Sequence, residues 1–163
     1  MLFPVLILAR QPIASGARKN TWEDNMFELI MVPVDLEHEE SLGRALSCAA
    51  DIARIHNSKV CYVGATMWAP NALSHAPAEY EKKLAGFAEG QANQYGHSSS
   101  HKMMISNDPV TDIDDVLLKA VKETGADLVV MATHKPGIGD YIWPSNGGRI
   151  AAHADTSVFL VRG

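Results

Sequence analysis

The feature that most constrains the fold is a regular alternation of short apolar runs with longer segments of helical period. The runs "FELIMVPVD" (27–35) and "ADLVVMATH" (126–134) are apolar almost throughout. Such a run is typical of a strand buried on both faces, as in a parallel sheet. In the segments between the runs, apolar residues recur every three or four residues, which is the period of an amphipathic helix.

This alternation predicts five strands and four helices. The expected strands are 27–35, 59–67, 101–106, 126–134 and 156–163, and the expected helices are 37–57, 78–96, 108–125 and a short one that ends near residue 153. Acidic residues crowd the first turn expected for helix 37–57, where they favour the helix dipole. Strands that alternate with helices of about ten or more residues pair in parallel through right-handed crossovers. The fold class is therefore a single-domain α/β fold, a doubly wound parallel five-stranded sheet with helices on both faces.

The first 25 residues do not fit this pattern. Residues 10–25 have neither a helix nor a strand period, and a second methionine, Met26, directly precedes the first strand. We expect the domain to span 26–163 and residues 1–25 to be an N-terminal extension outside it. The alternative is an added edge strand over residues 2–9.

Composition excludes several classes of function. A net charge of −5 argues against nucleic-acid binding, which favours a basic face. No apolar run reaches the ~20 residues of a transmembrane helix. Cys48, Cys61 and the seven histidines lack metal-ligand spacing, so no metal site is expected. We interpret the two cysteines as buried, reduced thiols of a cytoplasmic protein.

In open α/β sheets, ligands bind in the crevice beyond the carboxyl ends of the strands, at a topological switch point. The candidate strand ends are "PVD" (33–35), "GATM" (64–67) and "MATHK" (131–135). The last continues into a Gly-rich stretch before a helix, whose free N–H groups suit a phosphate. Ser145 offers a hydroxyl there, and Gly147 and Gly148 permit close approach of a ligand. The same stretch can also be only a tight connection, because neither GxxxxGK[ST] nor GxGxxG is present.

A carboxylate cluster follows the first strand: Asp35, Glu37, Glu39 and Glu40. It is either a solvated helix start or an aid to holding Mg²⁺ against phosphates. The sequence contains no nucleophile–base motif, so no chemical step is predicted.

Taken together, "LIMVPVD", "GADLVVMATH" and "HADTSVFLVR" resemble the universal stress protein family over 26–162. The resemblance implies an adenine nucleotide alpha hydrolase-like fold with strand order 3-2-1-4-5. The family's nucleotide-binding branch carries G-x2-G-x9-G-[ST] after the fourth strand, and here that frame falls on Ala132, Lys135, Pro144 and Ser145. The loop is more similar to a sub-branch that reads [ST]-H-R-P and ends in S-N. Pro144 departs from both versions and lacks an N–H donor.

The resemblance also implies a site and partners. Pro33, Val34 and Asp35 would line the adenosine side, with Ala65 at the adenine end. Around the ribose and phosphates it implies Met131, Ala132, His134, Lys135, Ser145, Asn146 and Gly147, with further charge from Arg149. The cofactor would be ATP, ADP or AMP, with Mg²⁺ accompanying ATP. The family further implies a homodimer through the last strand, Ser157–Val161.

Three functions remain open at this point. The first is a stress-response or regulatory protein that binds an adenine nucleotide and is at most a slow ATPase, since no base or arginine finger is evident. The second is a dimeric interaction protein with a degenerate site. The third is an enzyme on a related α/β scaffold, which the fold alone does not separate from the other two.

Overall fold

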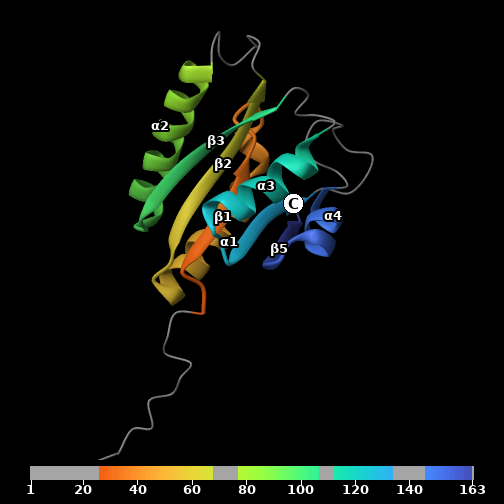
Figure 1. Ribbon diagram of the computed structural model, residues 1–163. Helices are drawn as coiled ribbons and strands as arrows, with labels where there is room; N and C mark the ends of the chain where they lie inside the picture. The colour runs from red at the N-terminus through yellow and green to blue at the C-terminus, as the bar shows by residue number, and fades with distance from the viewer. Residues whose placement is uncertain (1–25, 68–76, 107–111, 134–145, 163) are drawn as a thin grey trace, which may run out of the picture.

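Five parallel strands form the centre of the molecule, in the order β3-β2-β1-β4-β5 (Figure 1). The computed structural model describes residues 26–67, 77–106, 112–133 and 146–162. Its elements are β1 (Leu29–Val34), the 3-10 helix η1 (Glu39–Ser41), α1 (Gly43–His56), β2 (Lys59–Met67), α2 (Pro77–Tyr95), β3 (Ser99–Ser106), α3 (Ile113–Thr124), β4 (Leu128–Thr133), α4 (Asn146–His153) and β5 (Ser157–Arg162). The predicted fold class and strand order are confirmed. The expectations for residues 1–25, including the edge strand over 2–9, lie outside the described residues.

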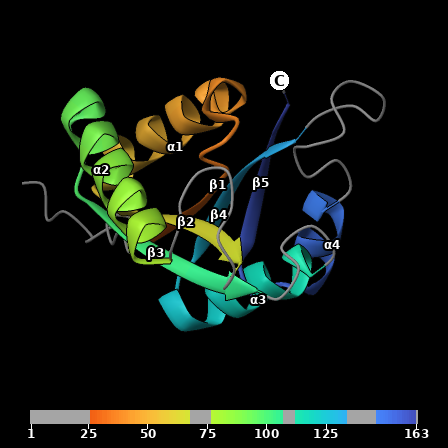
Figure 2. The same cartoon turned by 90° about the horizontal axis from the view of Figure 1, so that it is seen from above.

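Helices cover both faces of the sheet. Figure 2 shows α1 and α2 on one face and α3 and α4 on the other. Because side chains alternate along a strand, β1 feeds both layers: Ile30, Val32 and Val34 pack under α1 and α2, whereas Met31 packs toward α3 and α4. This two-sided burial explains why the β1 sequence is apolar almost throughout.

Two helices end where the sequence supplies a residue that tolerates a left-handed backbone. Asn57 follows α1 with φ 52°, and Gly125 follows α3 with φ 69°. Their N–H groups donate to the carbonyls of Ala53 and Val121, which closes the last turn of each helix. The end predicted for the third helix, at residue 125, is therefore confirmed.

The acidic start predicted for the first helix is wrong. Glu39 and Glu40 belong to η1, and α1 begins only at Gly43, with no acidic residue in its first turn. The cause is a tight turn after β1: the Ser41 N–H and hydroxyl both donate to the His38 carbonyl, at 3.1 and 2.8 Å. The carboxylates therefore lie beside the end of β1.

The third strand begins earlier than predicted, at Ser99 instead of residue 101. Serine has little intrinsic preference for strands, so the polar run hides the start of β3. Pairing of Ser99 with Val60 and of Ser100 with Cys61 extends the strand. Tertiary context here overrides local propensity.

Asp127 links the starts of the two central strands. One carboxylate oxygen accepts the Glu28 N–H at 2.7 Å, and the other accepts the Leu29 N–H at 3.2 Å. The Asp127 N–H in turn donates to the Leu29 carbonyl at 3.1 Å. These bonds hold β1 and β4 together at their amino ends.

Both cysteines are free thiols. Cys61 is buried as predicted, and burial raises its pKa. Cys48 differs from the prediction because it is only half-buried. None of the helices in the described part of the chain is both long enough and apolar enough to cross a membrane.

Candidate functional site

The switch point lies between β1 and β4, and these two strands share a short ladder. β1 pairs with β2 along its whole length, from Leu29–Lys59 to Val34–Gly64. Its pairs with β4 are Ile30–Leu128 and Met31–Val129, both in the amino-terminal half of β1. The carboxyl halves of the two central strands therefore leave backbone groups free of the β1–β4 ladder. This is the edge at which doubly wound sheets receive ligands.

The predicted residues on the strands do meet at this edge, but most are buried. Val34, Met131 and Ala132 are 1%, 1% and 8% exposed, and Pro33 is also buried. Of the predicted strand-end residues, Asp35 and Ala65 are partly exposed. The buried four can offer a ligand little beyond backbone groups, so among these described strand-end residues Asp35 presents the partly exposed polar side chain.

The loop that follows β4 lies largely outside the described residues. His134, Lys135 and Ser145 fall there, as does Pro144, while Asn146 is the first residue of α4. Their predicted phosphate contacts remain predictions.

Gly147 is described, and Leu160 fills the space beside it. A Cβ at Gly147 would lie 2.8 Å from Leu160 Cδ2. A side chain at this position would therefore displace the end of the Leu160 side chain, so packing of α4 on β5 favours glycine here whether or not a ligand approaches the Gly147 backbone. At Gly148 an added Cβ would meet nothing within 4 Å.

Arg149 has partners within the protein. Its guanidinium nitrogens lie 3.4 Å from Asp114 Oδ2 and 3.0 Å from Asp115 Oδ1, both on α3. The Asp114 side chain is 14% exposed, and burial raises its pKa while Arg149 opposes the rise. The arginine therefore ties α4 to α3. To serve a phosphate, as the resemblance implies, it would have to leave these two carboxylates.

The turn after β1 is organised around Asp35. Its Oδ1 accepts the Glu37 N–H at 2.9 Å, and its Oδ2 lies 2.9 Å from His38 Nδ1. The hydrogen bond from His38 to Asp35 is the main cause that raises the pKa of His38, and the charges of Asp35, Glu40 and Glu37 add to it. The predicted carboxylate cluster is thus partly built into a turn. The sequence did not predict the contact of His38 with Asp35.

Tyr80 of α2 was also missed. It is 4% exposed, and a Cβ at Gly64 would lie only 2.5 Å from the Tyr80 hydroxyl oxygen. Gly64 pairs with Val34, the last residue of β1, so the phenol lies near the carboxyl end of β1. Burial raises the pKa of Tyr80, with further rises from Asp35 and Glu37, so the phenol is neutral. A glycine inside a strand does signal close approach of another group, but it does not say which one.

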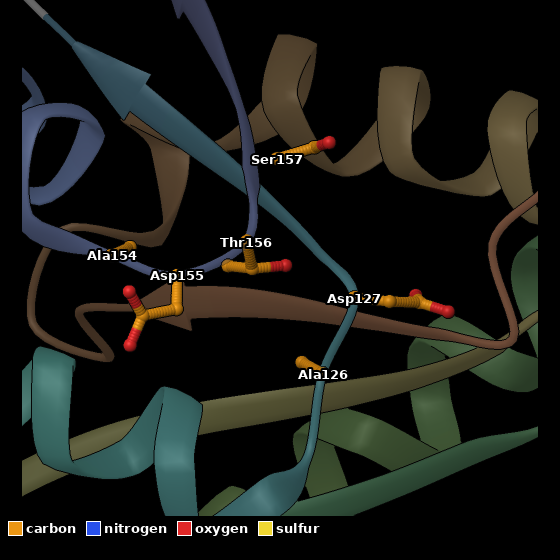
Figure 3. Close-up of a pocket in the computed structure, with 6 residues that line it drawn as sticks. All are labelled: Ala126, Asp127, Ala154, Asp155, Thr156 and Ser157. Carbon is orange, nitrogen blue, oxygen red and sulfur yellow. The ribbon is translucent and has the colours of Figure 1, made fainter.

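An open depression of the surface lies at the opposite edge of the sheet. Figure 3 shows its lining at the amino ends of β4 and β5: Ala126, Asp127, Ala154, Asp155, Thr156 and Ser157. The carboxylates of Asp127 and Asp155 point away from one another. Asp127 is already engaged with the start of β1, so this lining gathers no convergent set of polar groups.

β5 is an edge strand with apolar side chains on both faces. Phe159 and Leu160 are 47% and 37% exposed, whereas Val161 is 7% exposed and belongs to the core under α1. Exposed apolar side chains on an edge strand are features of a surface that pairs with another chain.

Comparisons with known proteins agree with this architecture. A model of the universal stress protein family matches residues 26–162. A universal stress protein solved in complex with cAMP is 20% identical, with a TM-score of 0.59, covering 83% of this chain and 97% of that one.

Two further structures are similar. The universal stress protein from Archaeoglobus fulgidus in complex with dAMP is 20% identical, with a TM-score of 0.55, covering 82% of this chain and 96% of that one. A family protein from Arabidopsis thaliana with AMP bound is 15% identical, with a TM-score of 0.55, covering 83% and 91%. At such low identities the solved structures support only the fold, whereas the family model shows membership of the family. The chain belongs to the universal stress protein family.

Proposed function

We propose that this protein is a stress-response or regulatory protein that binds an adenine nucleotide, ATP, ADP or AMP, at the carboxyl edge between β1 and β4. The observation that carries the proposal is the short β1–β4 ladder, whose pairs end at Met31 and Val129, with Asp35 held directly beside it. Solved relatives in the same family are complexes with cAMP, dAMP and AMP. These complexes support the nucleotide class.

In this proposal the adenosine lies against Asp35 and the backbone of Pro33, Val34 and Ala65. The ribose and phosphates lie toward Met131, Ala132 and the start of α4. The phosphate contacts are those that the sequence predicts: His134, Lys135, Ser145, Asn146 and Gly147. Mg²⁺ would accompany ATP, and any hydrolysis would be slow. We place the protein in the cytoplasm as a homodimer through Ser157–Val161.

The test is ligand identification. Native mass spectrometry of protein purified by gentle desalting should detect an adenine nucleotide, and AMP, cAMP or ATP with Mg²⁺ should raise the melting temperature. At a ligand concentration of 100 Kd, binding adds about 2.7 kcal/mol to the free energy of unfolding. Apo protein with no thermal shift by any of the three would refute the proposal.

A matched variant probes the loop. Pro144→Gly restores one glycine of the family frame and one backbone N–H donor, so it should tighten nucleotide binding. An unchanged Kd would show that this position does not reach the ligand.

A dimeric interaction protein with a degenerate site is the second candidate. It is favoured by the exposed Phe159 and Leu160 on the edge strand and by the burial of Pro33, Val34, Met131 and Ala132. Dimers that form without nucleotide, combined with a negative ligand test, would support this candidate over the first.

A further inference from the structure

Asp35 is fixed at the carboxyl edge by its own turn. Its two carboxylate oxygens are engaged separately, Oδ1 with the Glu37 N–H and Oδ2 with His38 Nδ1, each at 2.9 Å. The His38 N–H also donates to the Asp35 carbonyl, at 3.2 Å. Each carboxylate oxygen can accept more than one hydrogen bond, so the group stays able to accept a ligand donor in a defined orientation.

The imidazole that contacts Asp35 is itself held in place. The His38 carbonyl accepts both the N–H and the hydroxyl of Ser41, which fixes the His38 backbone at the start of η1. The His38 side chain is 31% exposed and that of Asp35 is 21% exposed. The pair is therefore anchored and still reachable by solvent and ligand.

The charges around the pair are mainly negative. Asp35, Glu37 and Glu40 act on His38, and Glu39 lies next to it in η1. From α2, Tyr80 faces the same carboxylates, and burial keeps its phenol neutral. An anionic nucleotide that approaches these carboxylates is repelled, and a protonated His38 offsets part of that repulsion.

We propose that His38 is a positioning residue of the nucleotide site: it holds the Asp35 carboxylate in the orientation that receives the adenosine part of the ligand, and its charge reduces the repulsion by the neighbouring carboxylates. This inference rests on the proposed nucleotide-binding function. It gives this protein a pH-sensitive affinity for its ligand, because imidazole changes charge near neutral pH.

The sign of the effect follows from the contacts. Protonated His38 makes a charge-assisted bond to Asp35, which is stronger than the bond made by a neutral imidazole. As pH rises through the His38 pKa, the ligand affinity falls. By linkage, ligand binding raises the His38 pKa by the corresponding amount. For a partly exposed pair, we expect the affinity to fall about threefold to tenfold between pH 5.5 and 8.5.

The experiment is calorimetric titration with cAMP over this pH range. cAMP is the probe because a phosphodiester has no ionisation there, whereas the second pKa of a phosphomonoester is about 6. His38→Asn keeps a donor near the Nδ1 position without a titrating group, and His38→Ala removes the donor. His101→Asn is the control, since His101 is an exposed imidazole on the outer strand β3.

The expected results separate positioning from a general structural role. Wild type and His101→Asn should lose affinity as pH rises. His38→Asn should bind cAMP with a Kd that does not depend on pH, and His38→Ala should bind more weakly than His38→Asn at every pH. A wild-type Kd that does not change with pH, or a slope that persists in His38→Asn, would overturn this inference and leave nucleotide binding intact. Absence of cAMP binding at any pH would overturn this inference, and absence of binding by AMP and by ATP with Mg²⁺ as well would overturn the proposed function together with it.

Discussion

The contact between Gly64 and Tyr80 provides a quantitative test of how α2 packs on the carboxyl edge. In Gly64→Ala, the new Cβ would lie 2.5 Å from the Tyr80 hydroxyl oxygen and 3.0 and 3.1 Å from two ring carbons. Ordinary contact begins at 3.4 Å, so the hydroxyl must retreat by 3.4 − 2.5 = 0.9 Å. Tyr80 is 4% exposed, so the ring has little free space.

The expected cost follows from two opposing effects. Overpacking a buried site costs about 1–3 kcal/mol. Replacing a strand glycine by alanine returns about 0.5–1 kcal/mol through reduced chain entropy. Three atoms of a buried ring stand within 3.1 Å of the added Cβ, so the upper half of the overpacking cost applies. The net expectation is a loss of about 1–2.5 kcal/mol in the free energy of unfolding, which lowers the melting temperature by about 2–10 °C for a chain of this size.

Urea unfolding at neutral pH, followed by circular dichroism, measures this loss. The controls are Gly86→Ala and Gly90→Ala in α2, where an added Cβ meets nothing within 4 Å. Both glycines lie inside a helix, so these two variants should instead gain about 0.5–1 kcal/mol each. Opposite signs for the same chemical change would separate packing from chain entropy.

A double variant identifies the obstacle. In a Tyr80→Phe background the closest contact is gone, so Gly64→Ala should cost less than half of what it costs in the wild type, apart from any effect of Tyr80→Phe alone. A Gly64→Ala protein as stable as the wild type would refute the packing of Tyr80 on Gly64. An equal cost in both backgrounds would show that the hydroxyl is not the obstacle.

Three further predictions concern the edges of the sheet and the junction of α3 with α4. Phe159→Glu should shift sedimentation toward monomer with a change in the free energy of unfolding within about 0.5 kcal/mol. Val161→Glu, at a core position, should instead unfold the protein. Persistent dimers of folded Phe159→Glu would exclude this face of β5 from the interface. Asp127→Ala leaves two backbone N–H groups without their carboxylate, so the free energy of unfolding measured in urea should fall by about 1–3 kcal/mol. An unchanged free energy of unfolding would mean that water replaces the carboxylate fully. Arg149→Gln removes the cation that opposes the raised pKa of Asp114, so the pKa should rise further by NMR titration. A raised folded-state pKa gives stability that is lost as pH rises through it, so the variant should be destabilised more at pH 7 than at pH 4, and an equal loss at both would contradict the pairing.

The fold could be predicted because burial imposes a period on the sequence. β1 and β4 are apolar on both faces, and Asn57 and Gly125 mark helix ends by a backbone conformation that few residues tolerate. The start of β3 was missed because its residues are polar and the strand depends on pairing with β2.

The candidate site was predicted less completely, for a different physical reason. Asp35 could be predicted as a candidate because it follows a strand end, which is a local feature. The contact of Asp35 with His38 depends on the path of the turn, and that of Gly64 with Tyr80 joins residues of different elements. Neither contact produces a repeating pattern in the sequence. The partners of Arg149 on α3 are likewise distant in sequence, so its ion pairs with Asp114 and Asp115 could not be predicted from the sequence.

The short ladder between β1 and β4 divides the sheet mechanically into a three-stranded and a two-stranded part. Few backbone bonds cross this seam, yet α1 packs against β1 and β2 on one side of it and against β4 and β5 on the other. Its buried face carries Ala45, Ala49 and Ala53, whose small side chains let the helix lie close to both parts. α1 therefore acts as a brace. Hydrogen exchange should show local opening of the seam at a lower free energy than loss of α1, so the edge proposed for the nucleotide can open while the domain stays folded.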